Sequence, residues 1–388
     1  MGKPLAMRLI IELLFSVSVV FLIIGKQSMY ASAELLFFVG VFINGLIFIY
    51  TCSRAFVAKD SSYFVTSLIF FMMVTTFPFF NSMVYFDRIP LGVVVAVLTS
   101  LNMFFVFKNS SNFKMLLVPF FFYAIYILQQ LQISPNPNDV FLNSKNWISY
   151  YLILLMFPYY FFTISNLQRA SVFPALLCFG LSLLSLSRSG IISSLLILFL
   201  ILLYRYKTKT VVYLISAVVV VLFLNVNLVS LWEALSQFEM NAASRFSVSS
   251  FFKDARSSIF LETLDYTDVK SLFFGFEGRL LYFTSINDFN PHNSLISAYI
   301  GGGLFQLMLI LFGLFLSIIF SDKFVALLVI FTFIRTLTDS GSFFVPFDFF
   351  FFLPLILIVY NSSSKCRFAF ASSSLLSKFQ LGIHGFRK

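Results

Sequence analysis

Residues 288–320 read DFNPHNSLISAYIGGGLFQLMLILFGLFLSIIF, and this stretch decides the fold because a polar segment gives way there to a long run without charge. The uncharged part, residues 293–320, exceeds the roughly 20 apolar residues that a helix needs to span a bilayer. The polar part ends a run from about Asn225 to His292 that collects acidic and basic side chains in an otherwise apolar chain. A membrane-spanning helix preceded by one large polar loop is therefore predicted.

The composition extends this interpretation to the whole chain of 388 residues. Hydrophobic residues make up 60% and charged residues 11%, whereas about 25% of the residues in a soluble domain are charged. The apolar runs are continuous rather than alternating, which favours helices over a transmembrane barrel. We interpret the 57 phenylalanines as lipid-facing surface. The net charge of +10 needs no nucleic-acid partner, because its placement in the loops explains it as topology.

Apolar windows predict an all-α, polytopic integral membrane protein with about 12 transmembrane helices and one large extracytoplasmic loop. The expected spans lie near residues 9–25, 34–52, 63–80, 91–107, 115–132, 147–163, 171–187, 190–204, 210–225, 293–320, 324–338 and 343–360. The corresponding regions are helices 1–9 in residues 1–225, a large periplasmic loop in 226–292, helices 10–12 in 293–360 and a basic cytoplasmic tail in 361–388.

The lysines and arginines predict the orientation, because short cytoplasmic loops carry an excess of them. With the amino terminus in the cytoplasm, every short inside loop is basic and both termini are cytoplasmic. The basic residues then placed inside are Lys3, Arg8, Arg54, Lys59, Lys108, Lys114, Arg169, Arg205, Lys207, Lys209, Lys323, Lys365, Arg367, Lys378, Arg387 and Lys388.

No cofactor or metal site is predicted. Cys52, Cys178 and Cys366 have no metal-ligand spacing and do not pair on one polar loop. The chain has no glycine-rich phosphate loop of the G-x-x-x-x-G-K-[ST] type. It also has no D-x-D pair of the kind that binds a metal together with a nucleotide sugar.

His292 is the first candidate for chemistry, because it is the only histidine outside the tail. Asn290 is a good helix N-cap and Pro291 a good first helical residue, so we expect His292 in the first turn of the following span. A helix amino terminus disfavours the imidazolium and so favours a neutral base. The alternative is a capping or interfacial histidine without a chemical role.

Arginines are the second group of candidates. Arg188 stands in Ser187-Arg188-Ser189-Gly190 at the outer junction of two spans, where it either faces a polar partner or snorkels to the interface. Arg335 poses the same question, and it could simply pair with Asp339 on one helix face. The large loop is more acidic than basic, so any anion site in it must be built from individual arginines: Arg245, Arg256 or Arg279.

The order of these motifs resembles the O-antigen ligase and O-antigen polymerase (Wzy) superfamily. The resemblance rests on the S-R-S-G junction, on Arg256 leading to Leu272-Phe273-Phe274-Gly275-Phe276, and on Pro291-His292-Asn293 followed by Gly301-Gly302-Gly303. It covers roughly residues 170–320 by motif and the whole chain by topology. The fuller histidine pattern of the ligase is absent, which favours the polymerase.

The resemblance implies a metal-independent glycosyltransferase of the bacterial inner membrane that polymerises undecaprenyl-diphosphate-linked oligosaccharide. His292, Arg188 and Arg256 would be catalytic, and Arg279, Arg335, Asn293 and Arg245 would bind substrate. The expected partners are this lipid-linked oligosaccharide, membrane lipid and a chain-length regulator protein. The alternatives are a ligase that transfers glycan to lipid A core and a lipid-linked-oligosaccharide flippase.

Overall fold

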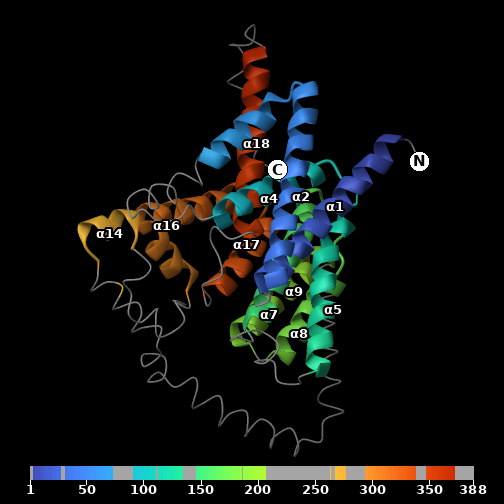
Figure 1. The fold of residues 1–388 in the computed structure, drawn as a ribbon, viewed down its shortest axis with the longest axis vertical. Coiled ribbons are helices and arrows are strands. Elements are labelled where there is room, and N and C mark those ends of the chain that lie inside the picture. The colour runs from blue at the N-terminus through green and yellow to red at the C-terminus, as the bar shows by residue number, and fades with distance from the viewer. Residues whose placement is uncertain are drawn as a thin grey trace, which may run out of the picture.

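The computed structural model describes residues 3–27, 31–72, 91–110, 112–133, 146–185, 187–206, 263, 267–276, 293–337 and 347–371. Within these residues the regular structure is entirely helical, as predicted (Figure 1). The elements are α1 (Lys3–Gln27), α2 (Ala31–Val57), a helix at Ser61–Met72, α4 (Leu91–Phe107), the 3-10 helix η1 (Phe113–Leu117), α5 (Val118–Ile133), α7 (Asn146–Ser165), α8 (Phe173–Leu184), α9 (Arg188–Arg205), α14 (Val269–Phe274), α16 (Ser294–Phe320), α17 (Lys323–Thr336) and α18 (Phe349–Ala371).

Five of the described helices are long and apolar enough to cross a membrane, which confirms the helical, membrane-protein class. Every expected span except 210–225 overlaps a described helix, and 210–225 lies outside the described residues. The number of about 12 spans therefore stays a prediction. Helix α18 continues to Ala371, so the first part of the predicted tail is helical.

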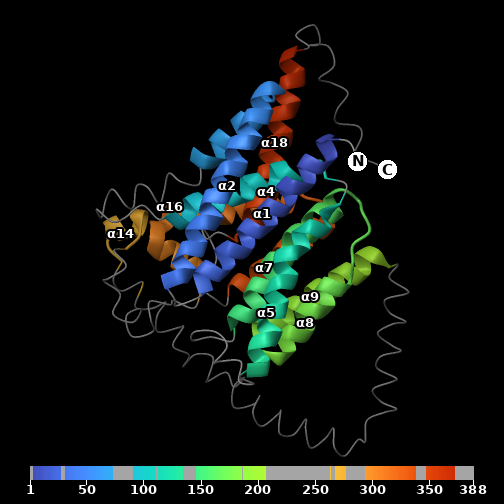
Figure 2. The same ribbon diagram turned by 45° about the vertical axis from the view of Figure 1, so that its right-hand side comes forward.

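Helix α7 forms the centre of the bundle, and nearly all of it is buried. Its sequence is apolar and aromatic on every side, which is the pattern of a helix surrounded by others. It packs against η1, α5, α8, α9, α17 and α18. Helices α1 and α2 run side by side and pack on each other (Figure 2), and they leave many apolar side chains exposed.

The phenylalanines do not serve only as lipid-facing surface, so that interpretation was wrong in part. Phe107 contacts Phe15 and Phe162, with ring centres 6.0 and 6.3 Å apart, and Phe162 stacks on Phe113 at 5.5 Å. These edge-to-face and stacked pairs join α1, α4, α7 and η1 through their rings. Other phenylalanines, such as Phe42, are exposed as expected.

Buried amides also hold the amino-terminal helices together. The Asn44 side chain donates to Ser18 Oγ at 2.8 Å, and Asn102 Nδ2 donates to the Asn44 carbonyl at 2.7 Å. Gly40 lies so close to α1 that a Cβ there would stand 2.9 Å from the Ser18 carbonyl oxygen. Small residues and interhelical hydrogen bonds are the usual means of helix association in membranes, where lipid is as apolar as the helices.

Two ends of the bundle can be distinguished by the contacts along α7 and α9. Ser149, near the start of α7, and Ser187, just before α9, contact each other, whereas Phe162 of α7 packs on η1. At the far end of α9, Tyr204 contacts Phe324 of α17. Residues predicted to lie on the same side of the membrane therefore contact one another. Which of the two ends faces the cytoplasm stays a prediction.

Candidate functional site

Arg335 lies in the last turn of α17 and is buried inside the bundle, with 1% of its surface exposed. Its Nε–H donates to Ser149 Oγ on α7 at 3.3 Å. The guanidinium carbon stands 5.5 Å from the centre of the Tyr150 ring, within the range of a cation–π contact. Arg335 therefore joins α17 to the first turns of α7. The alternative, a pair with Asp339, is not tested because Asp339 lies outside the described residues.

Ser149 connects Arg335 to the start of α9. Its hydroxyl donates to Ser187 Oγ at 3.2 Å. Ser187 occupies the N-cap position of α9, yet its side chain makes no capping hydrogen bond to the helix. A serine at this position usually accepts a hydrogen bond from a free backbone N–H, and the first turn of α9 lacks this side-chain acceptor. Arg188 is the first residue of this helix.

A close approach between α7 and α9 fixes this arrangement. Gly190 is buried, and a Cβ at its position would collide with Oγ and Cβ of Ser149 and stand 3.0 Å from Ser187 Oγ. The glycine of the Ser-Arg-Ser-Gly motif is therefore required by packing. Together these contacts define the Arg335 end: Ser149, Ser187, Arg188, Gly190 and Arg335.

Asp348 is a buried acidic residue that the sequence analysis missed. It directly precedes α18, and its carbonyl accepts from the N–H groups of Phe351 and Phe352 at 3.1 Å each. The neighbouring Phe347 ring contacts Tyr151 of α7 at 5.6 Å, which brings α18 to the Arg335 end. A carboxyl group within an otherwise apolar run is costly in a membrane, and that signal could have identified it.

The two glycine motifs of the carboxy-terminal half pack directly on each other. Helix α16 is kinked at Gly303, whose φ of 65° suits glycine best. A Cβ on Gly303 would collide with the backbone of Phe273, and one on Gly275 would stand 2.5 Å from the Ile300 carbonyl oxygen. The Phe276 N–H donates to that same oxygen at 2.7 Å. Helix α14 is thus seated against the kink of α16, at the edge of the bundle in both views (Figures 1 and 2).

A capping box starts α14. Ser271 N–H and Ser271 Oγ both donate to Asp268 Oδ1 at 2.6 Å, and the Asp268 N–H donates to Ser271 Oγ at 2.8 Å. These hydrogen bonds from Ser271 favour the carboxylate and hold the pKa of Asp268 below its usual value. The hydroxyl oxygens of Thr267 and of Tyr299 on α16 lie 3.2 Å apart, so a hydrogen bond between them joins this turn to α16.

The start of α16 differs from the prediction. Asn293 rather than Asn290 is the N-cap, and its Oδ1 accepts from the N–H groups of Leu295 and Ile296 at 2.8 and 3.2 Å. The helix begins at Ser294, so the prediction that His292 lies in its first turn was wrong. Both asparagines are good caps, and the second leaves the proline outside the helix. Asn293, expected to bind substrate, uses its side-chain oxygen for this cap.

The remaining predicted site residues are not tested. His292, Arg245, Arg256 and Arg279 lie outside the described residues. For Arg188 only the backbone is described. Among the described residues, no group of three or more histidine, cysteine, aspartate or glutamate side chains could hold a metal ion.

The fold and this site define the chain as a helical membrane protein with a buried arginine where three helix ends meet. No protein-family model matches the chain, and no curated protein matches it.

Proposed function

We propose that the chain is a membrane glycosyltransferase that polymerises polyprenyl-diphosphate-linked oligosaccharide repeat units into O-antigen or a capsule-like polysaccharide. The proposal includes about 12 membrane spans with a large extracytoplasmic loop, in the inner membrane of a bacterium. It rests on the resemblance of the motifs and on the geometry of the described residues that bear two of those motifs.

The single observation that carries the proposal is the start of α9, where an arginine is the first residue of a helix without a side-chain cap. Arg188 is its first residue, Ser187 makes no capping hydrogen bond, and Arg335 reaches it through Ser149. Backbone N–H groups at a helix amino terminus, together with arginine donors, suit the oxygens of a phosphate. A diphosphate leaving group held there would gain stabilisation as its negative charge develops.

The proposed reaction joins a sugar hydroxyl of one lipid-linked unit to the anomeric carbon of another. The hydroxyl oxygen forms the new bond, the bond from the anomeric carbon to the diphosphate oxygen breaks, and the diphosphate leaves with the electron pair. His292 accepts the hydroxyl proton as general base. Arg188 and Arg256 stabilise the diphosphate, and Arg245, Arg279 and Asn293 contact the substrate.

Arg335 receives a different role from the one its sequence suggested. Because its side chain is buried on Ser149 and Tyr150, we assign it to positioning the start of α9 rather than to direct contact with the substrate. The charge of Arg335 still adds to the positive potential at the start of α9, since the interior of the bundle screens charge weakly.

Deletion of the gene tests the function by the length of surface glycolipid on a gel. A polymerase deletion should leave core bearing a single repeat unit, because ligation still works. Bare core would instead overturn the proposal in favour of a ligase or a flippase.

His292→Ala tests the proposed chemistry in the same cells. It should reproduce the deletion at a normal protein level, since loss of a general base costs about 10²–10⁴ in rate. His384→Ala, at the other histidine of the chain, is the matched control and should keep the full ladder. A full ladder in His292→Ala would refute the role of this residue as base.

A further inference from the structure

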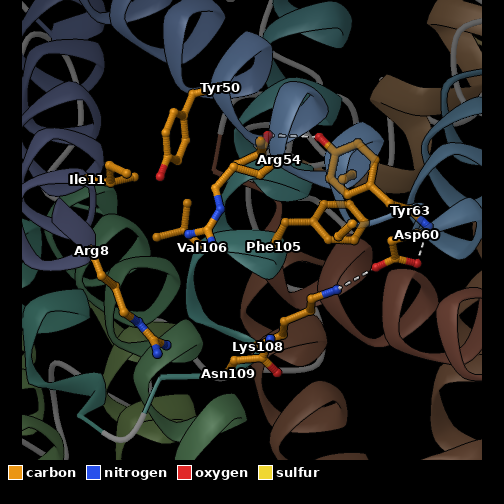
Figure 3. Close-up of a pocket in the computed structure, with 13 residues that line it drawn as sticks. Arg8, Ile11, Tyr50, Arg54, Asp60, Tyr63, Phe105, Val106, Lys108 and Asn109 are labelled. Atoms are coloured by element: carbon orange, nitrogen blue, oxygen red, sulfur yellow. Dashed lines mark hydrogen bonds and ion pairs between the residues drawn. The ribbon is translucent and has the colours of Figure 1, made fainter. Parts of the chain in front are cut away.

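A cavity of about 320 Å³ opens at the end of the bundle opposite the Arg335 end, where α1 begins and α2 and α4 end (Figure 3). Arg8 of α1, Tyr50 and Arg54 of α2, and Lys108 just beyond α4 line it, with Asp60 at one side. Figure 3 shows the Arg8 and Arg54 side chains reaching into the space between these helices. Its volume falls within the range of small-ligand sites.

The acidic groups at this cavity are already paired. Asp60 Oδ2 lies 3.6 Å from Lys108 Nζ, and Lys108 also donates to the Tyr360 hydroxyl at 2.9 Å. Behind the lining residues, the buried carboxylate of Glu12 accepts from Arg8 Nε at 3.0 Å. Lys108 and Arg8 thus each form an ion pair with one carboxylate, and neither carboxylate pairs with Arg54.

Two guanidinium donors remain for a ligand. Among the described residues, Arg8 Nη2 is buried and has no hydrogen-bond partner. The Arg54 side chain is exposed, and no described residue pairs with it. An unsatisfied buried donor is costly, and a turn of the partly exposed Arg8 guanidinium toward an acceptor held by Arg54 would remove that cost. Because α2 and α4 both end here, their carbonyl ends repel anions, so an anion at this cavity must be bound by side chains.

The chemistry of these donors points to phosphate. Guanidinium groups form paired, charge-assisted hydrogen bonds to phosphate oxygens, and a tyrosine hydroxyl such as that of Tyr50 can donate a further one. The surface beside the cavity decides the source of the phosphate. Ile10 of α1 and Phe56 and Val57 of α2 lie two or three residues along the chain from these arginines and expose 52%, 75% and 82% of their surface. Apolar side chains at these positions suit acyl chains rather than water.

We propose that this cavity binds the phosphate of an anionic glycerophospholipid, with Arg54 and Arg8 as its ligands and Ile10, Phe56 and Val57 against the acyl chains. The predicted orientation places the cavity at the cytoplasmic leaflet, where anionic lipids attract basic side chains. The site is separate from the Arg335 end and does not depend on the proposed polymerase function. The bound lipid bridges the start of α1 and the end of α2, so it stabilises the folded chain by mass action.

The test measures lipid binding to the purified full-length chain in a neutral detergent. Dioleoyl phosphatidylglycerol, dioleoyl phosphatidylcholine and inorganic phosphate are titrated separately, and the thermal midpoint and the lipid retained in native mass spectrometry are recorded. Phosphatidylglycerol should raise the midpoint and stay bound, whereas the other two ligands should do neither. An equal effect of phosphatidylcholine would overturn the role of the charge, and an equal effect of inorganic phosphate would overturn the lipid as its source.

Arg54→Gln is the decisive variant, because the Arg54 side chain has no described partner whose loss would unfold the protein. It should weaken binding of phosphatidylglycerol by roughly tenfold or more, and Arg54→Lys by less, since a lysine keeps the charge but not the paired geometry. Lys323→Gln is the matched control: it removes an exposed charge at the start of α17 and should leave the affinity unchanged. Equal affinities of Arg54→Gln and Lys323→Gln would show that only general surface charge attracts the lipid, and would refute the site.

Discussion

Replacing Gly190 by alanine has two opposite effects on the stability of the folded protein, one from helix propensity and one from packing. Alanine is about 1 kcal/mol more favourable than glycine inside a helix. At this position, however, the new Cβ would collide with Ser149 and approach Ser187 Oγ. Extra atoms in a well-packed core cost about 1–3 kcal/mol. We therefore expect Gly190→Ala to lower the stability slightly or moderately and to displace the start of α9.

Gly180→Ala is the matched control, because Gly180 lies within α8 and a Cβ there would meet nothing within 4 Å. Gly180→Ala should change the stability only through the gain in helix propensity. The free energies of unfolding of the two variants should therefore differ by the packing cost at Gly190, about 1–3 kcal/mol. That corresponds to a difference of a few degrees in the thermal midpoint. The assay is thermal unfolding of both purified variants, together with the glycan ladder in cells.

The proposed cause can be tested by a second change. In a Ser149→Gly background, which removes both Ser149 atoms that the new Cβ would meet, Gly190→Ala should cost less stability than it does in the wild-type chain. If Gly190→Ala raises the midpoint as much as Gly180→Ala does, the close approach of α7 and α9 does not exist and the reasoning fails.

Three further changes probe the contacts of the described residues. Arg335→Lys should shorten the glycan ladder less than Arg188→Lys does, because a residue that positions a helix tolerates a point charge better than a diphosphate ligand does; an equal loss would contradict the two roles. Gly303→Ala should release α14 and raise its hydrogen exchange, since Gly303 combines a φ of 65° with contact to α14, whereas Gly45→Ala, with open space around it, should not. The lowered pKa of Asp268 means that its carboxylate stabilises α14 above the unfolded value of 3.8 and loses this effect as the pH falls below it. Asp268→Asn should therefore reduce the protection of α14 near neutral pH and remove this acid-dependent change, and unaltered protection would show that the capping box contributes nothing.

The fold class could be predicted because it depends on local composition. A run of apolar residues as long as 293–320 can avoid water in few ways other than a membrane-spanning helix, and the structure has α16 there. The predicted helix boundaries were less accurate where two residues could each serve as the N-cap. Asn290 and Asn293 are equally suitable caps by type, and the choice between them depends on which backbone N–H groups the folded chain presents.

The contacts that build the candidate site could not be predicted. The sequence singled out Arg188 and Arg335 separately, but nothing in it indicates that Ser149 lies between their helices. The glycines at 275 and 303 were noted as parts of two motifs, yet their direct contact depends on how α14 folds back on α16. Such pairings arise from long-range packing of helices, and pattern and propensity describe only the local chain.

The burial of Arg335 does not by itself require a substrate. An arginine at the centre of a membrane costs about 2.5–3.5 kcal/mol on insertion scales. Its hydrogen bond to Ser149 can return about 1.5–3 kcal/mol as a bond to a charged group. The Tyr150 ring can add about 2 kcal/mol when water is excluded, and the end of α17 about 0.3–1 kcal/mol. Together these contributions are at least as large as the cost, so the protein alone can keep this positive charge in place. A charge that is held before any ligand arrives is preorganised, and under the proposed function it would add to the stabilisation of a leaving diphosphate at the start of α9 without first reorganising.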